Sequence, residues 1–268
     1  MGRPHWVPAG TDLDKPNAAR VYDYYLGGSH NFEADREMAR KAIELWPDLP
    51  AIMRSNRAFL RRAVRRVAER GITRFLDIGS GIPTFGAVHE VARGIRPESR
   101  VVYVDRDPVA VAHSRLLLKD DPLSQVVEAD LRSVEDLLSR PEVTELLDEG
   151  RPVAVLLVAV LHFITDEDDP ARLVSVLRDA LPPGSALVLS HASTEGRPDQ
   201  AGPHQDLYKS TPTPLTMRGR DRITALFEGF ELVEPGVVFL PEWHPENPDG
   251  VGPHPEWMSG LAGVGFLR

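Results

Sequence analysis

The chain has 268 residues, of which 42% are hydrophobic and 26% are charged, with no cysteine and a formal net charge of −9. This composition is typical of a globular protein, and the absence of cysteine excludes disulfides, thiolate metal sites and cysteine nucleophiles. Because the acidic charge opposes approach to a phosphate backbone, we expect a small-molecule partner and no nucleic acid.

The sequence carries no segment that predicts a membrane or secretory protein. Its first residues, Met1-Gly-Arg-Pro-His-Trp, lack the apolar run of a signal peptide. The longest apolar stretch, residues 153–161, is too short to span a bilayer. We therefore expect a soluble protein of the cytoplasm that makes no membrane contact.

The amino-terminal part, up to about residue 71, is predicted to be helical. Residues 51–69 carry an apolar stripe at helical spacing, formed by Phe59, Ala63, Val64 and Val67. Four arginines recur on another face of the same helix, namely Arg54, Arg57, Arg61 and Arg65. Such a row could hold an anionic acceptor or nucleic acid, but it is typical of a solvated helix face, and the negative net charge favours that interpretation.

The middle of the chain alternates between strand-like and helix-like segments, which predicts a mostly parallel sheet with helices on both faces. The predicted strands are residues 74–78, 101–104, 153–160 and 186–190, with a weaker one at 125–127. The predicted helices follow residue 84 and span residues 109–118, 134–138 and 170–181. The third strand is apolar throughout, as expected of a strand that is buried on both faces.

The carboxy-terminal part begins with residues 194–218, which are polar and proline-rich and are expected to form a mobile loop. A predicted helix at 221–227 follows. Residues 230–240 and 262–267 are predicted strands that pair as an antiparallel hairpin at the sheet edge. We expect one domain over residues 1–268, with a helical cover (1–71) and an α/β core (72–268).

A glycine loop follows the first predicted strand. Gly79 and Gly81 allow a sharp turn and a close approach of a ligand to bare backbone. The dinucleotide fingerprint requires a third glycine, but Thr84 stands at that position and Pro83 interrupts the turn. The carboxylate of Asp77 repels a diphosphate and suits an ammonium group. The loop therefore favours S-adenosylmethionine (SAM), which carries such a group, over NAD.

Two further aspartates end the next predicted strands. Asp105 lies 24 residues beyond Gly81, where an acidic side chain can accept hydrogen bonds from both ribose hydroxyls. Asp130 would lie at the same edge of a parallel sheet and could accept a hydrogen bond from the adenine amino group. Either residue alone could be a helix cap or a solvated loop residue. Their position at the ends of successive strands favours the cofactor interpretation.

These motifs resemble those of class I SAM-dependent methyltransferases. The wider sequence is similar to an actinobacterial SAM methyltransferase family that was first catalogued as a domain of unknown function. The class I motifs are Phe75-Leu-Asp-Ile-Gly-Ser-Gly, Val102-Tyr-Val-Asp and Ala129-Asp-Leu. The segments that match the actinobacterial family, which together cover nearly the whole chain, are Asn17-Ala-Ala-Arg-Val-Tyr-Asp-Tyr-Tyr-Leu-Gly-Gly, Asn31-Phe, Asn56-Arg-Ala-Phe-Leu-Arg-Arg-Ala-Val, Asp77-Ile-Gly-Ser-Gly-Ile-Pro-Thr and Trp243-His-Pro.

The resemblance implies a Rossmann-like fold with a seven-stranded sheet, an antiparallel last strand, and a helical cover over a SAM pocket. It also implies that further residues border the cofactor, namely Ser80, Arg106, Leu131, Ala159, Tyr25 and Asn31. Together with Tyr22, the last two would cap the methionine moiety or the acceptor. Without the resemblance, aromatic residues at helical spacing are more typical of core packing.

Two histidines are candidate catalytic residues. His162 ends the strand that borders the acceptor in this fold, and it could accept a proton or bind the acceptor; His191, which ends the next strand, is the second candidate. A structural role is the alternative for both. No spacing of metal ligands is present, and the acidic run at residues 166–169 is explained by capping of the helix that follows.

The function expected from these patterns is transfer of a methyl group from SAM to a small-molecule acceptor. Two alternatives remain at this point. An NAD-dependent oxidoreductase would use a similar glycine turn, and a non-catalytic module that senses SAM would need no acceptor pocket.

Overall fold

The structure is a computed structural model that describes residues 7–8, 10–83, 86–148, 150–209, 211–248 and 251–268. Its centre is a mixed sheet with the order β3-β2-β1-β4-β5-β8-β6, and β7 also pairs with β8. Strands β1 to β5 run parallel to one another, whereas β8 runs antiparallel to its neighbours β5, β6 and β7. The strands are β1 (Arg74–Ile78), β2 (Arg100–Asp105), β3 (Ser124–Glu128), β4 (Ala154–Val158), β5 (Ala186–Ala192), β6 (Phe230–Leu232), β7 (Val238–Phe239) and β8 (Gly260–Leu267).

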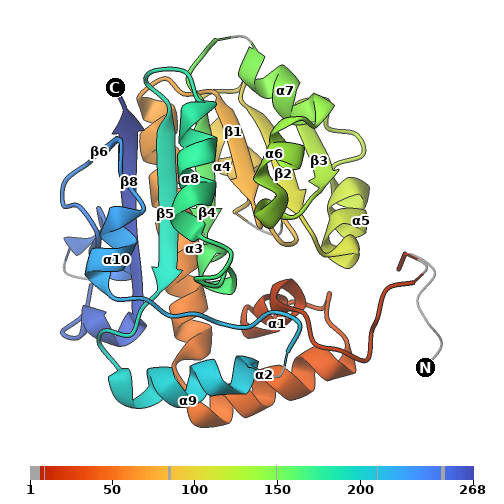
Figure 1. Cartoon of the computed structure of the whole chain (residues 1–268), viewed down its shortest axis with the longest axis vertical. Coiled ribbons are helices and arrows are strands. Elements are labelled where there is room, and N and C mark those ends of the chain that lie inside the picture. Colours follow the sequence, from red (N-terminus) through yellow and green to blue (C-terminus); the bar gives the residue numbers. More distant parts are fainter. Residues whose placement is uncertain (1–6, 9, 84–85, 149, 210, 249–250) are drawn as a thin grey trace.

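Helices cover both faces of this sheet (Figure 1), which confirms the predicted Rossmann-like α/β fold. One core contains α3 and α4, and the other contains α6, α7, α8 and α10. The helices are α1 (Ala18–Tyr25), α2 (Glu33–Leu45), α3 (Leu49–Glu69), α4 (Val88–Arg93), α5 (Pro108–Leu117), α6 (Val134–Leu138), α7 (Pro141–Asp148), α8 (Pro170–Asp179), α9 (Pro198–Tyr208) and α10 (Arg220–Ala225), with 3₁₀ turns η1 (Leu131–Ser133), η2 (Leu161–Phe163), η3 (Leu240–Glu242) and η5 (Pro255–Met258). No helix in the described part of the chain is long and apolar enough to cross a bilayer.

The central strands are apolar because both of their faces are buried. Side chains alternate between the two cores, so that Phe75 and Leu156 join one core while Leu76 and Val155 join the other. Every residue of β1 is buried. A parallel strand covered on both faces reads as a continuous apolar run, which is why the sequence predicted these strands.

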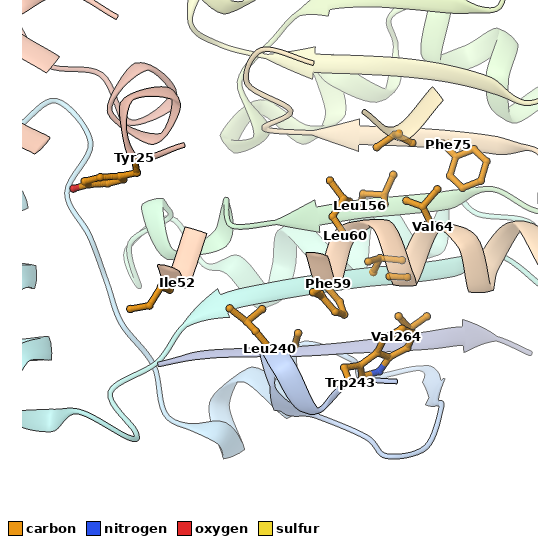
Figure 2. Packing of buried hydrophobic residues seen from close by; sticks show 14 of the residues in the cluster. Tyr25, Ile52, Phe59, Leu60, Val64, Phe75, Leu156, Leu240, Trp243 and Val264 are labelled. Carbon is orange, nitrogen blue, oxygen red and sulfur yellow. The ribbon is translucent and has the colours of Figure 1, made fainter. Parts of the chain in front are cut away.

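Helix α3 packs its predicted stripe against the sheet. Figure 2 shows Phe59 and Val64 of α3 near Phe75 of β1 and Val264 of β8. Phe59 also meets Trp243 edge to face, with 5.4 Å between the ring centroids. Full burial of such a side chain contributes roughly 1.5–3 kcal/mol, so this stripe fixes α3, including its polar residues, against the sheet.

The amino-terminal helices lie beyond the carboxyl ends of the parallel strands, where α1 and α2 meet α9 at the bottom of Figure 1. Three buried charges anchor them. Arg20 of α1 donates to Asp35 of α2 over 3.1 Å and lies 3.6 Å from the carboxylate of Asp107, which follows β2. Asp35 also accepts from the backbone N–H groups of Asn17 and Phe32. The predicted helical cover is thus tied to the core by an ion pair.

One predicted strand needed revision in detail. The strand expected at residues 230–240 is interrupted at residues 233–237 by a turn with positive φ at Gly236, so that β6 and β7 are separate strands. Both still pair antiparallel with β8, as predicted. The sheet therefore has eight strands although seven lie along its main path.

The segment at residues 194–218, expected to be a loop, contains the eleven-residue helix α9. This part of the prediction was wrong. Pro198 occupies the first turn, where it favours a helix, and Ala201, His204 and Tyr208 form the buried face at spacings of three and four. The mobility expected for this segment stays a prediction.

Candidate active site

The glycine loop turns tightly at the carboxyl end of β1. The N–H groups of Gly79 and Ser80 both donate to the carbonyl of Val104 on β2, over 2.8 and 3.1 Å. Gly79 has φ of 72°, and a Cβ there would lie 2.4 Å from a methyl carbon of Val160. Only glycine fits this position without a shift of Val160, which follows β4. The loop therefore presents bare backbone to the pocket.

Asp105 at the end of β2 holds the other half of the loop. Its carboxylate accepts from the N–H groups of Gly81, over 2.7 Å, and Asp107, over 2.8 Å. Burial raises the pKa of Asp105, and these backbone hydrogen bonds oppose the rise. Each oxygen keeps a lone pair for a ligand. The side chain can therefore shape the loop and still accept from hydroxyl groups in the pocket.

Asp77 and Arg57 bring opposite charges to the same pocket. Burial raises the pKa of Asp77 to about 7; the Arg57 guanidinium lowers it, and the neighbouring Asp105 raises it. Nη2 of Arg57 is buried and has no hydrogen-bond partner among the described residues. A cation with an open hydrogen-bonding site beside a carboxylate matches a zwitterionic amino-acid group, which carries both charges.

Arg57 was not predicted as a site residue. The sequence places it in a row with Arg54, Arg61 and Arg65, and helical spacing alone does not distinguish the four. What distinguishes Arg57 is the register of α3 against the sheet, which directs this arginine into the same pocket as Asp77. Arg54 and Arg65, in contrast, are exposed.

The pocket lining also contains Asp130, which was predicted to contact adenine, and Leu131 and Arg106, which were predicted to border the cofactor. Leu131 is buried there. The Asp130 carboxylate lies 3.4 Å from Arg106 and forms a closer ion pair with Arg132. Although partial burial acts to raise the pKa of Asp130, hydrogen bonds from Arg132 lower it to about 2. Asp130 is therefore ionised at neutral pH, and an adenine amino group would share its oxygens with two arginines.

The cover contributes Tyr22 and Asp23 to this pocket. Asn31, by contrast, does not line it: Asn31 donates to Asp23 over 2.8 Å and so positions that carboxylate. Gly28 also helps to position Asp23, because a Cβ at residue 28 would lie only 2.1 Å from an oxygen of that carboxylate. Asp23 was not predicted as a site residue, because the interpretation of this motif rested on the neighbouring Tyr22 and Tyr25.

A second pocket adjoins the first. Residues common to both are Ala18, Tyr22, Asn56, Ala159 and Phe163. Ala159, directly after β4, has a left-handed backbone with φ of 58°, which is uncommon outside glycine. Its N–H is held by the Ser190 carbonyl and hydroxyl. A strained residue that is fixed in this way forms the wall between the two pockets.

His162 and His191 border the second pocket. Nδ1 of His162 accepts from the N–H of Ala192 over 3.2 Å, so that the ring proton of this neutral imidazole is on Nε2. Burial, and then the charges of His191 and Arg218, lower its pKa well below the usual range. His162 in this state offers a donor to a ligand, which supports the predicted role in acceptor binding over that of a proton acceptor.

Both nitrogens of His191 are occupied within the protein. Its Nδ1 donates to the carbonyl of Ala192 over 2.7 Å, and its Nε2 accepts from Arg218 over 2.9 Å. Burial lowers its pKa to about 3. Arg218 is itself buried and pairs with Asp166. These contacts match the structural alternative for His191.

The structure therefore divides the predicted site residues between two pockets. The first gathers Asp77, Gly79, Ser80, Gly81, Asp105, Arg106, Asp130, Leu131 and Ala159. The second gathers Tyr25, Ala159, His162 and His191. Among the described residues, no group of three His, Asp or Glu side chains is arranged to hold a metal ion. Within the acidic run at 166–169, Asp169 caps α8, as expected.

Comparisons with known proteins agree with this geometry. The sequence profile of the S-adenosyl methyltransferase family matches residues 4–268. A crystal structure of a candidate methyltransferase from Thermobifida fusca is 41% identical, with a TM-score of 0.91 over 99% of this chain and all of that one. A DUF574 family protein from Streptomyces avermitilis is 39% identical, with a TM-score of 0.90 over 96% of this chain and 99% of that one.

A more distant structure shares the fold alone. The N-methyltransferase NodS from Bradyrhizobium japonicum, solved with S-adenosylhomocysteine (SAH), is 13% identical, with a TM-score of 0.51 over 93% of this chain and 99% of that one. No protein with a curated function matched the chain.

Proposed function

Because this chain belongs to the S-adenosyl methyltransferase family, we propose that its two adjoining pockets hold SAM and a small-molecule acceptor, with Ala159 between them. The chain is a SAM-dependent methyltransferase with a class I fold. SAM held in the first pocket would supply a methyl group: the acceptor's lone pair would form the new bond to the methyl carbon, the sulfonium sulfur would keep the electron pair of the broken bond, and the proton of a protic acceptor would leave to bulk solvent with the product. The protein then has to align the two molecules and exclude solvent.

We assign the ends of the cofactor by charge. Asp77 receives the ammonium group and Arg57 the carboxylate of the methionine moiety, since the buried Nη2 of Arg57 has no partner within the described chain. Asp105 accepts from the ribose hydroxyls, and Asp130 with Leu131 borders adenine. The single observation that carries this assignment is that an unpartnered, buried guanidinium nitrogen of Arg57 and the buried carboxylate of Asp77 belong to one pocket beside the glycine loop.

The carboxylate of Asp77 argues against the first alternative. An NAD-dependent oxidoreductase would place a diphosphate beside Asp77, where its negative charge is unfavourable. The second alternative, a non-catalytic SAM-binding module, leaves the second pocket without a use. We further propose that the enzyme acts in the cytoplasm on an acceptor other than nucleic acid, consistent with its net charge of −9, and that residues 1–268 form one domain.

The Arg57→Met variant tests the assignment. It should weaken SAM and SAH binding about 10–100-fold, because a hydrogen bond to a charged group contributes roughly 1.5–3 kcal/mol. Arg54→Met, on the exposed side of the same helix, is the matched control and should leave both affinities unchanged. Isothermal titration calorimetry measures them, with NADH as a second ligand. Equal affinities for the two variants would remove Arg57 from the site, and tighter binding of NADH than of SAM would overturn the cofactor assignment.

A further inference from the structure

Resting on the proposed function, we propose that the second pocket takes an uncharged aromatic molecule that accepts a hydrogen bond from Trp46 at the end remote from SAM. The pocket lies between the cover and the core, with walls from α1, α3, α9 and the turn after β4. In Figure 2, Tyr25, Ile52 and Leu240, which line it, come from three separate elements.

The absence of charge from the lining selects an uncharged ligand. None of the described residues that border the pocket is Asp, Glu, Lys or Arg. The three histidines that border it are neutral at pH 7, because burial lowers the pKa of His191 to about 3, that of His204 to about 4, and that of His162 well below the usual range. A charged acceptor would lose its hydration without gaining a partner of opposite charge.

The lining favours a flat ring. His204 and Tyr208 on α9 lie with their rings 5.1 Å apart, and Trp46 meets His204 edge to face at 5.6 Å. Phe163, at the wall shared with the SAM pocket, lies 6.2 Å from Tyr208. These spacings are those at which aromatic groups attract one another, so the four rings form a connected aromatic wall of the pocket against which a flat ring can pack.

Two buried polar atoms fix the orientation of the ligand. Trp46 and His204 are only 2% and 6% exposed. Nε1 of Trp46 and Nδ1 of His204 are buried and nevertheless have no hydrogen-bond partner among the described residues. The indole N–H is a donor only, so its partner must be an oxygen or nitrogen lone pair. A hydroxyl group on the ring matches this chemistry, since its oxygen can accept from the Trp46 indole and its proton can be donated to an unprotonated Nδ1 of His204. A buried donor left unpaired is costly, which makes this end of the pocket selective.

The opposite end of the ligand meets SAM. Ala159 and Phe163 border both pockets, so the atom that is methylated lies beside them, while the hydroxyl group lies at Trp46. Nε2 of His162 carries the proton that can be donated to the acceptor near this end. The acceptor is therefore recognised by two hydrogen-bond donors, the indole N–H of Trp46 and Nε2 of His162, which contact opposite ends of an apolar ring.

Binding of p-cresol and of p-toluate to the full chain saturated with SAH tests this inference. The two probes share a ring and a methyl group and differ in charge. Ligand-observed NMR should give p-cresol a dissociation constant at least about tenfold lower than that of p-toluate. Equal affinities, tighter binding of p-toluate, or no binding of either probe would overturn the proposed ligand class.

Two variants locate the binding. Trp46→Phe should weaken p-cresol binding about threefold to tenfold by loss of one hydrogen bond, and His204→Phe should have a similar effect. Trp243→Phe is the matched control and should have no effect, because that indole also lacks a partner within the described chain but lies outside the pocket. SAH affinity, measured on each variant, reports folding. If Trp46→Phe and His204→Phe retain both SAH and full p-cresol affinity, the polar contacts are wrong; failure of the wild type to bind SAH would instead refute the proposed function.

Discussion

Burial of Asp77 and a bound ammonium group act in opposite directions on the pKa of this carboxyl. Burial raises its pKa to about 7, so that in the free protein a large fraction of this carboxyl is neutral near physiological pH. An ammonium group placed against it would favour the ionised form. Binding of SAM should therefore release a proton from the protein.

The expected pH dependence follows from that release. Below pH 7 the carboxyl is mostly protonated, and part of the binding free energy is used to ionise it; above pH 7 that cost disappears. SAM affinity should rise about tenfold from pH 6 to pH 8. Calorimetry in two buffers of different ionisation enthalpy measures both the affinity and the proton released. Asp77→Asn should bind weakly with no such dependence, and a flat profile for the wild type would contradict the assignment of the ammonium group.

The residues that sequence reasoning found and missed differ in how their roles are determined. Gly79 and Asp105 were predictable because their roles depend on the chain next to them, at the end of a recognisable strand. Arg57 and Asp23 were not, because their roles depend on which side of a distant helix faces the sheet. His191 shows the reverse case: its position at a strand end is suggestive, but its Nε2 is occupied by Arg218, 27 residues away.

At the scale of elements, the strands were more predictable than the segments around the pocket. Apolar runs mark β1 and β4 because both faces are covered. Helix α9 was not predicted from the sequence, because it contains Pro203 and because its buried face combines an alanine with a histidine and a tyrosine. Elements that line a pocket carry polar and aromatic residues for the ligand, and this weakens the hydrophobic pattern on which prediction depends.

The attachment of the cover should depend on Arg20. Replacing this buried arginine with Met leaves the carboxylates of Asp35 and Asp107 without their cation, and loss of one partner of a buried pair typically costs about 3–5 kcal/mol. Arg20→Met should lower the free energy of unfolding by that amount in urea denaturation and should weaken SAM binding as well. Arg40→Met is the control, because its ion pair with Glu33 is exposed and contributes less than about 1 kcal/mol. Equal effects of the two variants would show that the pair does not hold the cover.

On the scale of the whole molecule, the cover and the core share one buried cluster that includes Val21, Met38, Phe59 and Val188. We therefore expect one cooperative unfolding transition. Circular dichroism and tryptophan fluorescence, to which Trp46 of the cover contributes, should give coincident curves. SAH at a hundred times its dissociation constant should shift both curves together by about 2.7 kcal/mol. Separate transitions, or a shift in only one of them, would contradict a single domain.

The wall shared by the two pockets also bears on how acceptor preference could change. A substitution at Ala159 or Phe163 alters the space for both ligands at once, so that a gain for a new acceptor is coupled to a loss for the donor. Leu49, Leu215 and Met217 border the second pocket alone. Diversification in nature, or random mutagenesis in the laboratory, can vary these three positions without disturbing the methyl donor.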